Sequence, residues 1–277
     1  MKQQLIKFFK IIRWKNVVVY LLLQVLLYFA FFDKHFSITD AWLFLTLSIT
    51  FFGIFGNIHN NIIDYELDQK KKNFIAFDKT SYLILAIIFV ILGLLFGFAA
   101  FYFSFSPTLL YAILIFPIGL GVYNMYLKQL PLIGNLLVAA LTSLSIYVPF
   151  ANAKNIDYHD EKFYFLIAMA FILTLMREII KDIEDMEVDK QFNFKTLPII
   201  SRKSAFSLYG ILNILYFVFL FMHKSTLKSL CFYTLLITGL ISWGIATKLL
   251  KKKKYHQISL MIKFVMLIGF MAVTLLS

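Results

Sequence analysis

Residues 82–103 read YLILAIIFVILGLLFGFAAFYF, an unbroken apolar stretch without a charged side chain. A helix needs about 20 residues to cross roughly 30 Å of hydrocarbon, so this stretch is long enough to span a bilayer. Other apolar runs lie before and after it, and several must extend into flanking polar residues to reach that length. Together the runs are residues 17–32, 41–58, 82–103, 109–127, 132–151, 163–176, 205–222, 230–246 and 258–276. The pattern predicts an all-α fold, a polytopic membrane bundle of about nine transmembrane helices.

The composition indicates the same class of protein. Apolar residues make up 61% of the 277 residues and charged residues 15%, whereas soluble domains average roughly 45–50% and 25%. The 32 Phe residues exceed what a soluble core of this size would bury. We therefore expect residues 1–277 to form a single transmembrane domain. The one cysteine, Cys231, lies in an apolar run, which excludes a disulfide framework within the chain and predicts a buried thiol.

The distribution of basic residues predicts the orientation in the membrane. If the N-terminus is cytoplasmic, most of the 27 Lys and Arg residues fall on the cytoplasmic side, as the positive-inside rule requires. The opposite side then holds only Lys34, Lys154, Lys162, Lys224 and Lys228. We expect a multi-pass protein of the cytoplasmic (inner) membrane in contact with membrane lipids, with Ser277 on the outer side. A nucleic-acid partner is not expected, because the basic residues are scattered along membrane-flanking loops.

Two acidic segments stand out, because ionisable groups at the edge of a membrane span are costly and often functional. The first acidic segment, residues 60–68, reads NNIIDYELD, and the second acidic segment, residues 177–189, reads REIIKDIEDMEVD. Read as helices, they place three polar side chains each on one face. These are Asn60, Asp64 and Asp68 in the first segment, and Asp182, Asp185 and Asp189 in the second. Both segments fall on the cytoplasmic side in the predicted topology.

Carboxylates on one helix face repel one another unless cations neutralise them. A few carboxylate oxygens, completed by water and phosphate, are the usual way in which proteins bind Mg²⁺. Two facing acidic helices would therefore hold metal ions that in turn hold a diphosphate. The alternative is that both segments are merely solvated helix ends beyond the membrane.

These motifs resemble the UbiA superfamily of intramembrane prenyltransferases. The family pattern N-D-x-x-D-x-x-x-D is similar to residues 60–68, with Asn61 where Asp is usual, and K-D-x-x-D-x-x-x-D is similar to residues 181–189. The resemblance extends to LKQLPLIGN at residues 127–135, KTLP at residues 195–198 and RWKN at residues 13–16. The wording of the second acidic segment is most similar to the geranylgeranylglycerol-phosphate geranylgeranyltransferase branch of the family.

The resemblance implies a Mg²⁺-dependent prenyltransferase that moves a prenyl group from a prenyl diphosphate to a lipophilic acceptor. The acceptor would be similar to geranylgeranylglycerol phosphate or would be an aromatic or quinone precursor. The resemblance assigns Asp64, Asp68, Asp185 and Asp189 to catalysis. The implied metal ligands are Asn60, Asp64, Asp68, Asp182, Asp185 and Asp189, and the implied diphosphate-binding residues are Asn60, Lys128, Lys181 and Arg177.

The chain departs from the family after Asp68, where N-K-P-x-R-P is usual and QKKKN stands at residues 69–73. The lysine run can supply positive charge but lacks the bidentate fork of arginine. Two other readings stay open at this point. Buried carboxylates also occur in secondary transporters and other ion-coupled membrane proteins, and a relative with an altered loop could be catalytically idle. Prenyl length, acceptor identity and oligomeric state do not follow from the sequence.

Overall fold

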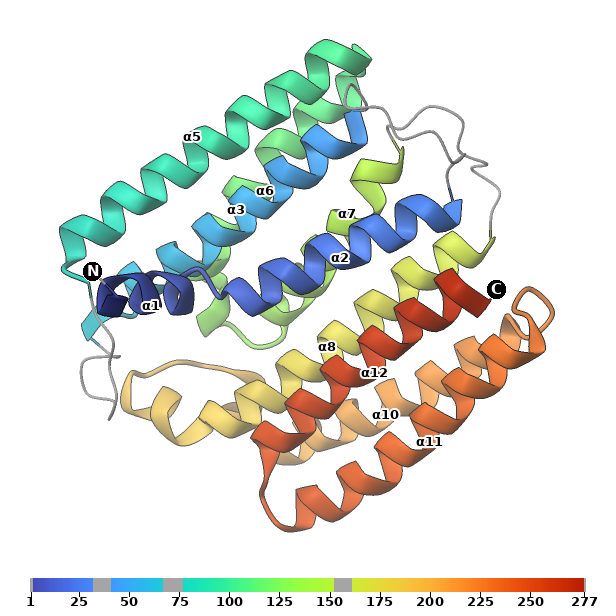
Figure 1. Cartoon of the computed structure of the whole chain (residues 1–277). Helices are drawn as coiled ribbons and strands as arrows, with labels where there is room; N and C mark the ends of the chain where they lie inside the picture. The colour runs from blue at the N-terminus through green and yellow to red at the C-terminus, as the bar shows by residue number, and fades with distance from the viewer. Residues whose placement is uncertain (1, 32–40, 67–76, 152–160, 277) are drawn as a thin grey trace. The chain divides into compact units, whose positions relative to one another are not determined.

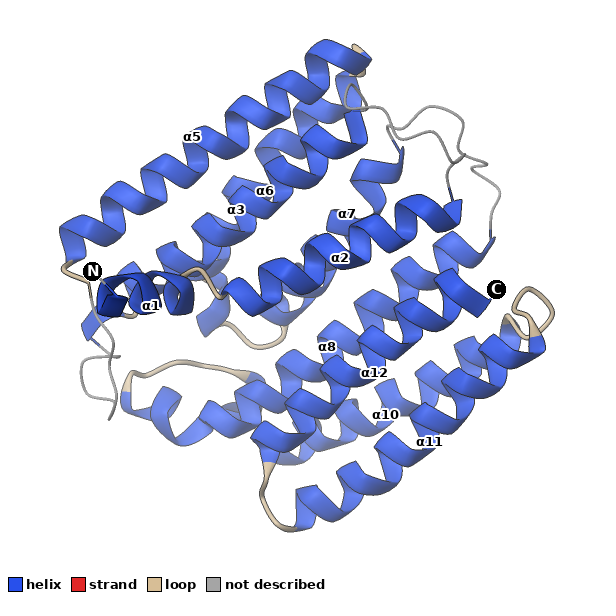
Figure 2. Cartoon of the chain, viewed as in Figure 1, coloured by secondary structure: helices blue, strands red, loops and turns tan. Residues whose placement is uncertain are grey.

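The computed structural model describes residues 2–31, 41–66, 77–151 and 161–276, and within these ranges the secondary structure is helical (Figure 2). Eight helices are long and apolar enough to cross a membrane, and another is apolar over Leu109–Met125. Each predicted apolar run coincides with or overlaps one of these helices. The chain is an integral multi-pass membrane protein, which confirms the predicted fold class.

The chain divides into two compact units. The first contains Met1–Met125 and Ser145–Ile156, and the second contains Tyr126–Leu144 and Asp157–Ser277. Helix α7 (Ile133–Ala151) contributes its first part to the second unit and its last part to the first. The expectation of a single domain over residues 1–277 stays a prediction.

In the first unit, the two long helices α3 (Ala41–Ile63) and α5 (Lys79–Ser104) pack closely along their length (Figure 1). The helices of this unit, besides the end of α7, are α1 (Lys2–Ile11), α2 (Trp14–Phe31), α3 (Ala41–Ile63), α5 (Lys79–Ser104) and α6 (Pro107–Met125). A Cβ atom at Gly93 of α5 would lie 2.5 Å from the Phe52 ring of α3. The Ser48 hydroxyl of α3 donates a hydrogen bond to the Gly93 carbonyl at 2.7 Å. A small residue at position 93 therefore allows the close helix contact that is common in membranes.

A second contact in this unit compensates for a proline. Pro149 lies inside α7 and has no backbone N–H, so the helix leaves the carbonyl of Ser145 without its usual donor. The Tyr20 hydroxyl and the Gln24 side-chain amide of α2 each donate to that carbonyl at 3.0 Å. An unsatisfied backbone group is costly away from water, so these two bonds tie α2 to the proline-containing part of α7.

In the second unit, helix α8 packs against both α10 and α12, and α12 also packs against α11 (Figure 1). The elements of this unit, besides the start of α7, are a short 3-10 helix (Leu127–Gln129), α8 (Glu161–Gln191), α9 (Leu197–Ile200), α10 (Arg202–Met222), α11 (Ser229–Lys251) and α12 (Tyr255–Leu276). The Cys231 thiol is buried, as its apolar surroundings in the sequence predicted.

Helix α8 extends well past the apolar run predicted at residues 163–176. It is 31 residues long and continues through the second acidic segment to Gln191. The apolar run ends at the first charged side chain, whereas the helix continues because residues 177–189 include strong helix formers (Arg, Lys, Met and three Glu) and no Gly or Pro. The three aspartates of this segment therefore share one continuous helix, as their spacing predicted.

Candidate active site

The second acidic segment lies at the C-terminal end of α8, where its aspartates differ in exposure. Asp182 and Asp189 are half-buried and Asp185 is exposed. Beyond α8 the chain turns at Asn193, which has a positive φ of 58°. The backbone N–H of Phe194 bonds to the Asp189 carbonyl at 3.2 Å, so the turn stays close to the last aspartate.

Asp182 is held by a residue from another helix of the same unit. The Asn135 side-chain amide, near the start of α7, donates to Oδ2 of Asp182 at 2.8 Å. Asn135 is buried, with 7% of its surface exposed. The sequence indicated Asn135 only as the last residue of the LKQLPLIGN stretch, and its contact with Asp182 was not predicted. The one available signal was a polar side chain at the start of an apolar helix.

The LKQLPLIGN stretch is tightly folded around Gly134. A Cβ atom there would lie 2.5 Å from the Leu127 carbonyl oxygen, so any larger residue would displace backbone. Leu132 has a positive φ of 65°, which places the preceding turn in the left-handed region. This geometry brings Lys128, half-buried in the 3-10 helix, and Asn135 into one short loop-to-helix segment.

The KTLP segment joins this loop. The backbone N–H of Lys195 donates to the Gln129 carbonyl at 2.9 Å, and Thr196 is buried. Pro198 lies in the first turn of α9, where its missing N–H costs nothing. Within the second unit, these contacts place the Lys128 loop, which is distant in the sequence, beside α8 and the KTLP segment that follows α8.

The two predicted cations of α8 contact a glutamate. Glu178 is buried, and its Oε1 atom accepts a hydrogen bond from Arg177 Nη1 at 2.6 Å. Its Oε2 atom accepts one from Lys181 Nζ at 2.7 Å. Arg177 and Lys181 are partly exposed, at 21% and 34% of their side-chain surfaces. Glu178 belongs to the second acidic segment, but the sequence indicated no role for it.

The first acidic segment begins in the last turn of α3 in the first unit and continues beyond Ile63. The Asp64 backbone N–H bonds to the Asn60 carbonyl at 2.9 Å, so the two residues are one helical turn apart. Both side chains are half-buried. Asp68 and the lysine run at residues 70–72 lie outside the described residues.

A buried amide braces the helix just before this segment. Asn124 at the end of α6 donates to the Gly56 carbonyl of α3 at 2.9 Å and lies 3.3 Å from Nδ1 of His59. The His59 ring also stacks on Phe55, with ring centroids 5.4 Å apart. These contacts fix the turn of α3 that leads into Asn60.

The described carboxylates fit Mg²⁺ by their chemistry rather than as a ready-made cage. Among the described residues, no three His, Cys, Asp or Glu side chains lie close enough together to hold a metal ion. Mg²⁺ is usually bound by one or two carboxylates together with water and substrate phosphates, so it does not need such a cage. Asp64 and Asp185 belong to different units, and their joint action stays a prediction.

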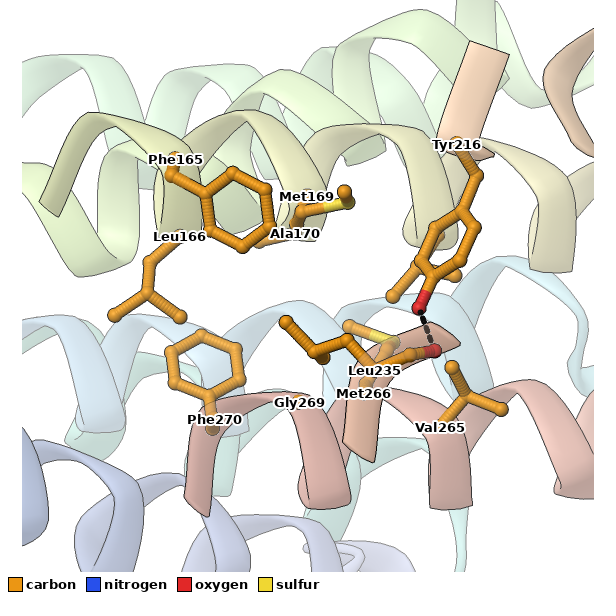
Figure 3. A pocket seen from close by; sticks show the side chains of 11 residues that line it. Phe165, Leu166, Met169, Ala170, Tyr216, Leu235, Val265, Met266, Gly269 and Phe270 are labelled. Atoms are coloured by element: carbon orange, nitrogen blue, oxygen red, sulfur yellow. Dashed lines mark hydrogen bonds between the residues drawn. The ribbon is translucent and has the colours of Figure 1, made fainter. Parts of the chain in front are cut away.

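An apolar cavity lies elsewhere in the second unit, among α8, α10, α11 and α12 (Figure 3). Met169, Leu235 and Phe270 are part of its wall, and the Tyr216 hydroxyl beside it donates to the Leu235 carbonyl at 3.0 Å. The cavity volume is about 20 Å³, room for about one water molecule. This volume is too small for a prenyl chain.

Two curated proteins that are similar to this chain carry the same name, digeranylgeranylglyceryl phosphate synthase. The chain is 32% identical over 232 residues to the digeranylgeranylglyceryl phosphate synthase of Methanosphaera stadtmanae, covering 78% of this chain and 80% of the relative. It is 38% identical over 130 residues to the synthase of Pyrococcus horikoshii, covering 46% of this chain and 42% of that one.

Solved structures share the fold. A structure of digeranylgeranylglyceryl phosphate synthase matches with a TM-score of 0.73 at 22% identity, over 98% of each chain. A UbiA homolog from Archaeoglobus fulgidus, bound to GPP and Mg²⁺, matches with a TM-score of 0.63 at 18% identity, over 97% of this chain and 100% of that one. The family model for UbiA prenyltransferases matches residues 20–273. The chain therefore belongs to the UbiA prenyltransferase family.

Proposed function

We propose that this prenyltransferase moves a prenyl group from a prenyl diphosphate to a lipid acceptor of the glycerol-phosphate type, with Mg²⁺ as the cofactor. The observation that carries the proposal is the charge pattern of α8, where Asp182 is held by Asn135 and directly follows Lys181. The names of the relatives support the acceptor class. The structures of the Archaeoglobus fulgidus homolog with GPP or DMAPP and Mg²⁺ support the donor and the cofactor.

The carboxylates of both acidic segments would hold the metal. The proposed ligands are Asn60, Asp64, Asp68, Asp182, Asp185 and Asp189, with Asp64, Asp68, Asp185 and Asp189 as the catalytic group. Bound Mg²⁺ neutralises charge on the diphosphate and so makes it a better leaving group. The carboxylates need this cation for a second reason, because without it they would repel an anionic substrate.

The basic residues would bind the diphosphate directly. Lys128, Lys181 and Arg177 supply N–H donors to its oxygens, and the amide of Asn60 is a neutral donor for the same group. The bond between the allylic carbon and the diphosphate oxygen breaks, and the electron pair leaves with the diphosphate. The acceptor hydroxyl oxygen then forms a new C–O bond to that carbon, and its proton passes to water.

We further propose that the protein lies in the inner membrane with both acidic segments and the N-terminus on the cytoplasmic side. The distribution of Lys and Arg supports this orientation. A reporter that works only on the outer side should then give a signal when it is fused after Ser277. A signal from a reporter that works only in the cytoplasm would overturn the proposed topology.

The enzymatic proposal is tested with the full-length protein in detergent. Release of inorganic diphosphate from geranylgeranyl or farnesyl diphosphate is measured with Mg²⁺ and with a chelator. Each reaction is run with a glycerol-phosphate lipid and with an aromatic quinone precursor. We expect Mg²⁺-dependent release and a prenylated product with the phosphate-bearing lipid only. Product from the aromatic acceptor alone would overturn the acceptor class. Thermal stabilisation by Na⁺, with no effect of a prenyl diphosphate analogue and Mg²⁺, would support a transporter instead.

A further inference from the structure

The buried carboxylate of Glu178 has no part in the proposed reaction, yet it contacts two of the proposed diphosphate-binding residues. Glu178 is 4% exposed, and each of its oxygens accepts a hydrogen bond from one cation, Arg177 on one side and Lys181 on the other. The two distances, 2.6 and 2.7 Å, are those of strong charge-assisted bonds.

Stability alone is a weak reason for a carboxylate at this position. Burying a charged group costs several kcal/mol, and an apolar residue of similar size often serves a buried site as well or better. The residues that follow it on α8, Ile179 and Ile180, are buried and apolar. A buried glutamate therefore points to a task that only a negative charge performs.

That task follows from the spacing of the cations. Arg177 and Lys181 are four residues apart on α8, a spacing at which like charges on one helix face repel. Both side chains are long and flexible, and both are partly exposed. A carboxylate between them cancels the repulsion and holds both groups near the helix.

The pairing leaves donors for a substrate. Lys181 Nζ carries three N–H donors and the Arg177 guanidinium carries five, and Glu178 accepts one bond from each. Both side chains are partly exposed, so their remaining donors can reach a ligand. The cluster keeps a net positive charge next to Asp182, where the proposed function places an anionic diphosphate.

We propose that Glu178 is a positioning residue that holds Lys181 and Arg177 in place for the diphosphate of the prenyl donor. This inference rests on the proposed function. Without the carboxylate, the two cations separate, and diphosphate binding weakens because the lysine must be ordered again at each binding event. The chemical step changes less, since the same groups reach the diphosphate once it is bound.

The test compares variants of the full-length protein in detergent. KM for geranylgeranyl diphosphate, kcat and the thermal midpoint are measured with saturating Mg²⁺. Glu178→Gln keeps the size of the side chain and removes its charge, so we expect KM to rise about tenfold, the effect of losing one charge-assisted contact. We expect kcat to stay within about threefold, and Glu178→Asp, which keeps the charge, to recover part of the loss in KM.

Glu187→Gln is the matched control. Glu187 pairs with Lys190 at the same spacing of three residues on the same helix, at 3.3 Å, but its side chain is 75% exposed. An exposed pair contributes little, so KM and kcat should stay near the wild-type values. A similar rise in KM in this control would mean that charge on α8 in general, not Glu178, sets donor binding, and would overturn the proposal.

A double-mutant cycle separates positioning from folding. Lys181→Gln should raise KM by itself, and adding Glu178→Gln should then raise KM by much less than it does in the wild type. A lower thermal midpoint of Glu178→Gln with unchanged KM would show a structural ion pair and overturn the positioning role. If Glu178→Gln does not fold, the KM of Glu178→Asp decides, because an unchanged value would overturn the role. Wild-type protein that releases no diphosphate would refute the proposed function and this inference together.

Discussion

The side-chain amide of Asn135 donates a hydrogen bond to Oδ2 of Asp182 over 2.8 Å. The bond joins the start of α7 to the second acidic segment, between residues 47 positions apart in the chain. Asn135 is buried and rigidly placed by the close backbone approach at Gly134. A partner of this kind orients a metal-binding or substrate-binding carboxylate, and its loss usually weakens the site without abolishing it.

Removing that amide should therefore lower activity. Asn135→Leu is expected to reduce Mg²⁺-dependent diphosphate release by about 10- to 100-fold, because Asp182 loses the donor that fixes its orientation. The control is Asn213→Leu, since Asn213 is equally buried at 7% and its amide donates at 2.8 Å to a backbone carbonyl of its own helix. Activity of Asn135→Leu equal to that of the control would remove Asn135 from the site.

The acidic segments should both be needed for turnover. Asp64→Ala and Asp185→Ala are each expected to lower Mg²⁺-dependent turnover by about 100-fold or more, because each removes charge that stabilises the departing diphosphate through the metal. Folded yield should change little. Glu66→Ala is the control, because Glu66 is exposed and is not one of the three polar residues that share a helix face in the first acidic segment. Near-wild-type turnover of either aspartate variant at saturating Mg²⁺ would remove that segment from the reaction.

The contact between α3 and α5 should tolerate no side chain at position 93. In Gly93→Ala the new methyl would lie 2.5 Å from the Phe52 ring, so the ring or the helices must shift. We expect a loss of about 1–3 kcal/mol in the free energy of unfolding, measured by denaturation in mixed micelles. Gly53→Ala is the matched control on α3, because its new Cβ meets nothing within 4 Å beyond its chain neighbours and the backbone of its own helix. It should be neutral or slightly stabilising, and an equal loss in both variants would contradict the packing argument.

The donors to the Ser145 carbonyl should matter only while Pro149 is present. Gln24→Leu is expected to destabilise the protein by about 0.5–1.5 kcal/mol, the usual net value of one hydrogen bond. In a Pro149→Ala background the restored backbone N–H can donate to the same carbonyl, so the cost of Gln24→Leu should shrink. The thermal midpoints of the wild type, the two single variants and the double variant measure the coupling. Purely additive effects would show that the missing N–H of Pro149 is not the reason why the Ser145 carbonyl needs donors from α2.

Much of the fold could be predicted because the bilayer imposes a simple length rule on each span. An uninterrupted apolar run such as residues 82–103 forms a helix in a bilayer, because a helix satisfies the backbone hydrogen bonds within the segment. The rule misses α1 (Lys2–Ile11), which is amphipathic rather than uniformly apolar. It also ends α8 too early, since a charged side chain closes an apolar run but does not end a helix.

The candidate site was predicted only in part, because a sequence pattern reports on residues that are close together in the chain. The helical period places Asp182, Asp185 and Asp189 on one face, and this depends on residues a few positions apart. The sequence by itself thus determined the membrane class, the approximate number of spans, the two acidic segments and the family. Only the tertiary structure decided that Asn135 holds Asp182, that Glu178 pairs with both cations, and that the Ser145 carbonyl takes its donors from α2. The contacts of Asn135 and of Ser145 join segments distant in the chain, and the Glu178 pairing depends on which rotamers the surrounding helices leave open, so neither kind follows from a local pattern.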